Sequence, residues 1–297
     1  MKKKYLTMLL FFVMLFQLSA TQALADNNIG ETAFTSENMD MVSFDDERRI
    51  PSSMLLLDTA YADGVSGIRR GNTYGPSWNA ANVAIDGRPD VGLHRVMFLK
   101  FDLSSWGDLV WSFERTQLRL STYSDTNPSN EDHFEIYMLP QEMEQYIDDT
   151  LIYETAEKNG MLNNIGQKLY TSPALEARKS YTSDDFASAL LEHLQNNPQD
   201  KIVSFKVIST TNHGYTIRGY GAGSTERPAL EIGYLPNHQK DAYFLELPGV
   251  VDGNMTLPTT GVYGSEITWK SSDESIISSA GEVSVATANE DYSIEDN

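Results

Sequence analysis

One alternating stretch, residues 91–104 (VGLHRVMFLKFDLS), constrains the fold more than any other part of this chain of 297 residues. Its odd positions are apolar except at Arg95, and they comprise Leu93, Met97, Leu99, Phe101 and Leu103. Its even positions are His94, Val96, Phe98, Lys100 and Asp102. A period of two is typical of a β-strand whose side chains point alternately to opposite faces. The stretch therefore predicts a strand with one face in a core and another face that carries cations and an aromatic ring.

Similar short runs, separated by turn residues, recur along the middle of the chain. They lie at residues 55–61, 81–85, 95–103, 116–123, 133–139, 201–208 and 229–234. This pattern favours an all-β, antiparallel, jelly-roll-like β-sandwich over residues 54–236. We expect Leu99, Phe101, Leu118 and Leu120 in its core.

One short helix is expected to interrupt these strands. Ser183 is a plausible N-cap, and Phe186, Leu190 and Leu194 fall on one face before Pro198. The segment 142–179 is ambiguous, with a strand at 151–153 as one interpretation.

The central strand also carries a resemblance. The pattern R-x-x-x-L-K-F-D-L-S at residues 95–104 follows GNTYGPSWNAANV and precedes QLRLSTY. Together these segments resemble carbohydrate-binding module family 96 and the related DNRLRE domains, over about residues 57–234. The resemblance implies binding to a polysaccharide, with alginate-like uronates as the leading class. It also implies a role ancillary to a carbohydrate-active enzyme.

The ends of the chain differ from this middle part. Residues 1–25 are typical of a secretory signal peptide, with Lys2 to Lys4, the apolar run 8–16 and the ALA pattern at 23–25. We therefore expect a secreted, extracellular protein with no membrane segment after cleavage. Residues 26–53 are polar and predict a flexible lead-in.

Residues 240–297 resemble bacterial immunoglobulin-like domains of secreted carbohydrate-active proteins. The resemblance rests on residues 257–258 (LP), 267–269 (ITW), 271–273 (SSD) and 281–283 (GEV). The pattern stops before the closing strands, so we expect an incomplete immunoglobulin-like domain from a truncated gene product. A natural end with partial disorder is the alternative.

Composition restricts the function. The chain has 22 basic and 42 acidic residues, a formal charge of -20, which argues against nucleic acid as a partner. It has no cysteine, which excludes disulfides and thiol catalysis. It also contains no G-x-S-x-G, H-E-x-x-H or glycine-rich phosphate loop. We expect a noncatalytic chain that needs no cofactor.

A binding face is predicted by the loop that follows residue 68 (IRRGNTYGPSW). Planar polar groups, aromatic rings and arginines suit the hydroxyls, C–H faces and carboxylates of acidic sugars. The candidate ligand-binding residues are Arg69, Arg70, Asn72, Tyr74, Trp78, His94, Lys100, Arg218 and Tyr220. Structural roles compete with this interpretation: Trp78 as a cap of the sandwich, Phe98 under a second layer, and Arg95 paired with Asp86 or Asp90.

A metal site is a weaker prediction. Asp125, Asn127, Ser129 and Glu131 alternate as calcium-binding oxygens do, but such residues also form ordinary turns. Two other functions remain open: the front part of a polysaccharide lyase or glycoside hydrolase, and a structural cell-wall or adhesin spacer. The oligomeric state is open as well.

Overall fold

The computed structural model describes residues 50–70, 80–88, 94–123, 131–163, 165–196, 198–247, 251 and 253–284. It divides into two compact units, of which one spans Ile50–Pro236 and the other includes the described residues from Asn237 onward. The expected signal peptide and nearly all of the expected lead-in lie outside the described residues. A short 3-10 helix, η1 (Ser52–Met54), precedes the first strand.

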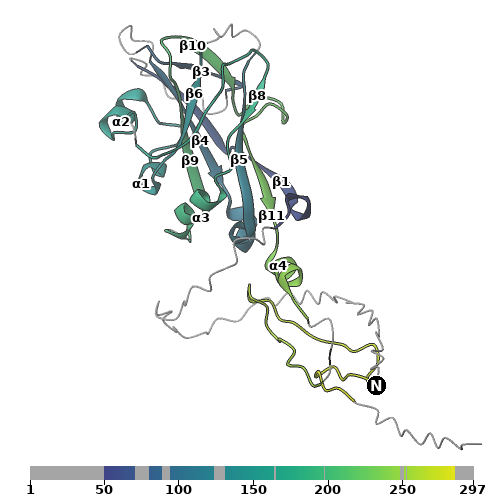
Figure 1. The fold of residues 1–297 in the computed structure, drawn as a ribbon. Helices are drawn as coiled ribbons and strands as arrows, with labels where there is room; N and C mark the ends of the chain where they lie inside the picture. The colour runs from purple at the N-terminus through teal and green to yellow at the C-terminus, as the bar shows by residue number, and fades with distance from the viewer. Residues whose placement is uncertain are drawn as a thin grey trace, which may run out of the picture. The chain divides into compact units, whose positions relative to one another are not determined.

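The unit Ile50–Pro236 is an antiparallel β-sandwich, so the predicted fold class is confirmed (Figure 1). The smaller sheet has the order β1 (Leu56–Tyr61), β11 (Ala229–Tyr234), β5 (Phe113–Ser121) and β8 (Ser180–Thr182). The larger sheet has the order β10 (Gly214–Arg218), β3 (Asn82–Asp86), β4 (Arg95–Asp102), β9 (Ile202–Ser209), β6 (Phe134–Met138) and β7 (Gln167–Thr171). Strand β2 (Gly64–Arg69) pairs with β4 beside this path.

The main core fills the space between the two sheets. Leu99 and Phe101 on β4 and Leu118 and Leu120 on β5 have no exposed surface, which confirms the predicted core. Phe101 packs edge-to-face against Phe205 of β9, with ring centroids 5.7 Å apart. The odd face of the central strand is therefore the inner face, because its alternating apolar residues meet those of the opposite sheet.

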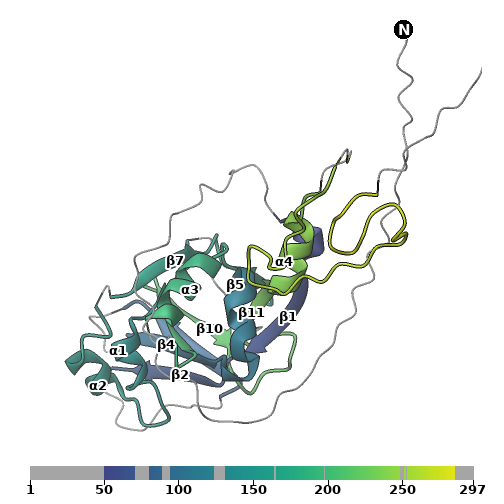
Figure 2. The same ribbon diagram turned by 90° about the horizontal axis from the view of Figure 1, so that it is seen from below.

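The other face of β4 is also buried, under a layer that we call the helical cover (residues 139–163). The cover contains α1 (Gln141–Glu144) and α2 (Tyr153–Lys158), which lie on the side of the larger sheet away from β5 (Figure 2). Phe98 and Val96 have no exposed surface and pack with Ile147 and Met161 of the cover. The prediction that Phe98 faces solvent is thus wrong, and the alternative that a second layer covers Phe98 is confirmed.

The helices differ from the expected single helix. Besides η2 (Ser104–Ser112) and the helices of the cover, the sandwich has α3 (Ala187–Gln195), which packs against β5 and β9. Helix α3 begins later than predicted because Ser183 bonds to the sheet instead of capping a helix. The Ser183 hydroxyl accepts a hydrogen bond from the amide of Leu118 on β5 at 2.9 Å. The strand considered at 151–153 is also wrong, since Tyr153 begins α2.

The second unit opens with α4 (Asn237–Phe244) and continues mostly without regular strands. In its described part, isolated bridges join Thr260 to Glu266 and Ile277 to Val283. The buried Asp241 carboxylate accepts hydrogen bonds from the amides of Tyr263 (2.7 Å) and Ser265 (3.0 Å). Polar loop contacts therefore supply much of the local order of this unit.

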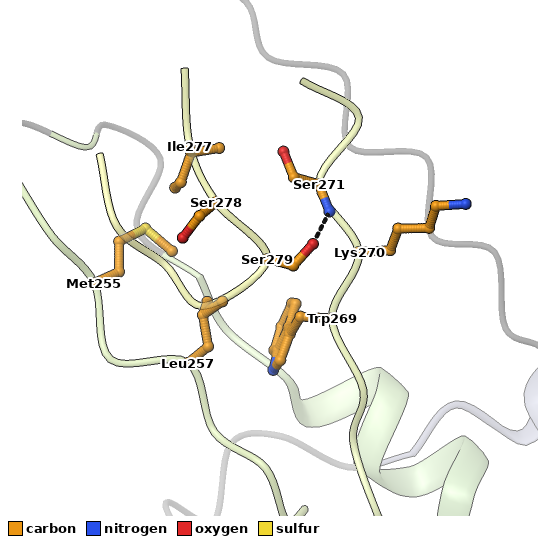
Figure 3. Close-up of a pocket in the computed structure, with 8 residues that line it drawn as sticks. All are labelled: Met255, Leu257, Trp269, Lys270, Ser271, Ile277, Ser278 and Ser279. Carbon is orange, nitrogen blue, oxygen red and sulfur yellow. Dashed lines mark hydrogen bonds between the residues drawn. The ribbon is translucent and has the colours of Figure 1, made fainter. Parts of the chain in front are cut away.

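A small apolar pocket lies within the second unit (Figure 3). Met255, Leu257, Trp269 and Ile277 line it, and the Trp269 indole donates to the carbonyl of Pro258 at 2.7 Å. Of these four side chains Ile277 is buried and the other three are partly exposed, so the apolar layer is thin. Across the described parts of both units, no helix combines the length and the apolar character needed to cross a bilayer.

Candidate functional site

The ends of three strands bring arginines together in the larger sheet. Arg95, the first residue of β4, lies opposite Arg69 of β2 and opposite Asp86 of β3. Arg88 lies two residues after Asp86, and its guanidinium pairs with the Asp86 carboxylate. We call Arg69, Arg88 and Arg95, with the carboxylate of Asp86 between them, the arginine cluster. Strand register, not sequence proximity, assembles it.

Asp86 anchors this cluster. Its carboxylate is 3% exposed and accepts hydrogen bonds from Nε of Arg88 at 2.9 Å and from Nη2 of Arg88 at 2.5 Å. The backbone amide of Arg88 donates to the same carboxylate at 3.0 Å. Burial alone would raise the pKa of Asp86, but the hydrogen bonds and charge of Arg88, with the charge of Arg95, lower it below its ordinary value. The carboxylate therefore stays ionised near neutral pH.

Arg95 is the least satisfied member of the cluster. Its Nε is buried and has no hydrogen-bond partner in the described part of the chain. Burial, followed by the charges of Arg69 and Arg88, lowers the pKa of Arg95, and the charge of Asp86 opposes this shift. Among the described residues, three guanidinium groups thus lie near the carboxylate of Asp86, and Arg88 pairs with it directly. A site of this kind attracts a further anion, because Arg pairs strongly with carboxylates.

Arg70 and His94 lie beside the cluster. The amide of Arg70 donates to the carbonyl of His94 at 3.0 Å. The His94 Nδ1 lies 2.6 Å from the hydroxyl of Tyr153, and the two rings meet edge-to-face. Burial, and then the charge of Arg70, lower the pKa of His94, which favours the neutral imidazole. Of the predicted ligand-binding residues, the structure brings together Arg69, Arg70 and His94.

Three other predicted ligand-binding residues lie elsewhere in the sandwich: Lys100, Arg218 and Tyr220. Lys100 is five residues from Arg95 on β4, about 16 Å along the strand. Arg218 lies opposite Asn82, which is about 13 Å from Asp86 along β3.

Arg218 and Tyr220 are also engaged with protein partners. The Arg218 guanidinium stacks 4.3 Å from the Tyr123 ring centroid and pairs with Glu226 at 3.0 Å. The ring of Tyr220 is stacked by Arg227, whose Cζ lies 3.9 Å from the ring centroid. The structure does not bring either residue to the arginine cluster.

Asn72, Tyr74 and Trp78 lie outside the described residues, as do Asp90 and three of the four proposed calcium ligands: Asp125, Asn127 and Ser129. Within the described ranges, no group of three or more His, Asp or Glu side chains is arranged to hold a metal ion. Calcium binding thus stays a prediction.

Sequence reasoning missed two features at this end of the sheet. It sought a partner of Arg95 and overlooked that Asp86 pairs with Arg88, although the D-G-R spacing was the available signal. It also missed the pair of Asp132 and His213, whose carboxylate oxygen and Nδ1 lie 2.8 Å apart. The hydroxyl of Thr211 donates to the same buried carboxylate at 2.7 Å. No local sequence pattern links residues so far apart in the chain.

Gly214, the first residue of β10, makes the site close-packed. A Cβ at Gly214 would lie 2.6 Å from a carboxylate oxygen of Asp86 and 3.6 Å from Nη2 of Arg88. Because His213 precedes Gly214, the Asp132–His213 pair and the arginine cluster share one end of the larger sheet. The arrangement can hold an anion, and the buried Asp132 orients the half-exposed His213.

The comparisons with known proteins concern the second unit. Residues 225–294 match the model of a family described as atrophied bacterial Ig domain. The chain therefore carries a bacterial immunoglobulin-like domain. The match begins within the sandwich unit, since it includes strand β11. None of the curated proteins matches the chain.

Proposed function

We propose that this chain is a secreted, noncatalytic saccharide-binding protein whose sandwich binds an anionic polysaccharide of the uronate type. The observation that carries the proposal is the arginine cluster: Arg88 pairs with the buried carboxylate of Asp86, and Arg69 and Arg95 lie beside this pair, in a chain with a formal charge of -20. A uronate carboxylate would pair with guanidinium groups of this cluster. The resemblance of the strand 95–104 to carbohydrate-binding modules supports the same ligand class.

The immunoglobulin-like domain fits an ancillary role in this proposal. Bacterial domains of this type and the signal-peptide pattern of residues 1–25 together favour an extracellular protein that presents the sandwich to a polysaccharide. In this role the sandwich would hold a larger assembly, such as a polysaccharide lyase or glycoside hydrolase, on its substrate. The competing role is a cell-wall or adhesin spacer that binds no sugar.

A retention experiment on polygalacturonate gel tests the proposal. Arg69 and Arg70 are exposed at the end of β2, so the double variant Arg69→Gln/Arg70→Gln should remain folded. An exposed charge pair contributes roughly 0.2–1 kcal/mol, so the double variant should lose about 2- to 30-fold in affinity. Raised salt should weaken the wild type in part.

The matched control is a double variant with the same charge change, Arg178→Gln/Lys179→Gln, in the exposed connection between β7 and β8. Equal losses in the two double variants would mean that only net charge matters, and the cluster would not be the site. A wild type that ignores polygalacturonate and alginate would favour the spacer role.

A further inference from the structure

The face of the larger sheet beneath the helical cover, which we call the covered face, is unusually polar for a packed interface. One row across it consists of Ser66, Phe98, Lys206 and Tyr137, from β2, β4, β9 and β6. In the next row Lys100 lies opposite Ser204. A face that evolved only for packing is normally filled by apolar side chains, as the opposite face of β4 is.

Two hydroxyls on the covered face have no partner. The side-chain oxygens of Ser66 and Ser204 are fully buried and make no hydrogen bond in the described part of the chain. Most buried polar side-chain atoms in proteins are hydrogen-bonded, and an unmet one lowers stability. Both oxygens lie on the side of the sheet that carries Phe98 and Lys206. A polar ligand placed on this face would give them the partners that the cover does not.

The same face also buries the ammonium of Lys206. It has no exposed surface, and its ammonium donates to the main-chain carbonyls of Met161 (3.3 Å) and Asn163 in the cover. It also lies 5.0 Å from the centroid of the Tyr137 ring. Burial lowers the pKa of Lys206 to about 8, which shows that the closed cover disfavours the charged form. The closed cover thus leaves two hydroxyls unpaired and buries one hydrogen-bonded ammonium.

The covered face leads to Arg70 and His94, the neighbours in sequence of Arg69 and Arg95 of the arginine cluster, whose side chains belong to the opposite face of β2 and β4. Ile68 and Val96 lie opposite each other on it, and the next residues on the same side are Arg70 and His94. His94 is joined to the cover through the hydroxyl of Tyr153. One edge of the cover therefore ends at His94, next to the strand ends that carry the cluster, so a polymer that passes from the cluster around these strand ends would meet the cover.

We propose that the helical cover is a displaceable lid and that the covered face is a second section of the saccharide site, binding further sugars of the same polyuronate along β4. The chemistry of the face suits a sugar chain: an aromatic ring for C–H faces, two hydroxyls, and the ammonium groups of Lys206 and Lys100. This inference rests on the proposed function. Apolar packing of the cover keeps the closed state dominant without ligand, so the apparent affinity is reduced by the small open fraction.

Hydrogen exchange with and without an alginate oligosaccharide tests the displacement. Amides of 141–163 should exchange faster in the bound protein, while amides of β4 become more protected. Unchanged or slower exchange of 141–163 in a protein that does bind the oligosaccharide would overturn the lid and leave the proposed function standing. Absence of any binding would instead refute the proposed function.

Serine variants test the face itself. The double variant Ser66→Ala/Ser204→Ala removes two unpaired hydroxyls, so it should raise thermal stability and yet weaken alginate binding by about 4-fold or more, since two hydrogen bonds to ligand are lost. The matched control is Thr116→Val, because Thr116 Oγ1 is another buried hydroxyl without a partner, on β5 of the other sheet. It should raise stability without changing affinity. Serine variants that behave like Thr116→Val would overturn the inference.

Discussion

Replacing Lys206 with Met tests the electrostatic description of the covered face. Folding lowers the pKa of Lys206 from 10.5 to about 8, so the unfolded chain holds this proton more tightly than the folded one. Between these two values the unfolded state binds more protons, and the stability of the folded state rises with pH. Below pH 8 the full cost of burying the ammonium is present.

The size of this effect follows from the shift. Each pKa unit corresponds to 1.36 kcal/mol, so the wild type should gain about 2 to 3 kcal/mol over Lys206→Met between pH 7 and pH 10. At pH 7 two opposing effects should keep the difference in free energy of unfolding between the two proteins small. The variant loses the buried charge but also loses the donor to the carbonyl of Met161, whereas the carbonyl of Asn163 still accepts from the amide of Ile165.

The assay is urea unfolding at several pH values from 7 to 10, with the difference in free energy of unfolding plotted against pH. Other titrating groups are common to both proteins and cancel in this difference. Lys158→Met, at an exposed position of α2, is the matched control and should give a flat difference. A flat or falling difference for Lys206→Met would refute the argument that burial lowers the pKa of Lys206.

Three further predictions concern packing and order. Gly214→Ala should displace the Asp86 carboxylate and cost about 1–3 kcal/mol in urea unfolding; unchanged stability would contradict the close approach. Asp86→Asn should destabilise most above about pH 4 and less as pH falls, because the lowered pKa of Asp86 stabilises the fold only while the carboxylate is ionised; a pH-independent loss would argue against this. Limited proteolysis should cut residues 240–297 before the sandwich, and the reverse order would count against a thin core in the second unit.

The inner face of the sandwich could be predicted because its information is local. Leu99 and Phe101 on β4, and Leu118 and Leu120 on β5, alternate within single strands. Such a pattern needs no knowledge of the partner sheet. It even contained a hint of the second layer, since Val96 makes the other face of β4 partly apolar, as in a strand that is buried on both sides.

The cover and the arginine cluster could not be predicted in the same way. Helices α1 and α2 have four and six residues, too few for a helical period to stand out. The cluster depends on Arg69, Asp86 and Arg95 becoming neighbours through strand register. Register between strands is a property of the whole sheet, so the sequence pointed to Arg69 and missed Arg88, which pairs with Asp86.

The pairing of β1 with β11 has a mechanical consequence. The first strand of the sandwich runs antiparallel to its last, with Leu56 opposite Tyr234 and Tyr61 opposite Ala229. The chain therefore enters and leaves the sandwich at neighbouring points on one edge. Tension applied through the two flanking segments would act first on the Leu56–Tyr234 end and would separate the paired residues one pair at a time. When the polypeptide is stretched, strands β1 and β11 of a sandwich attached in this way should separate at low force.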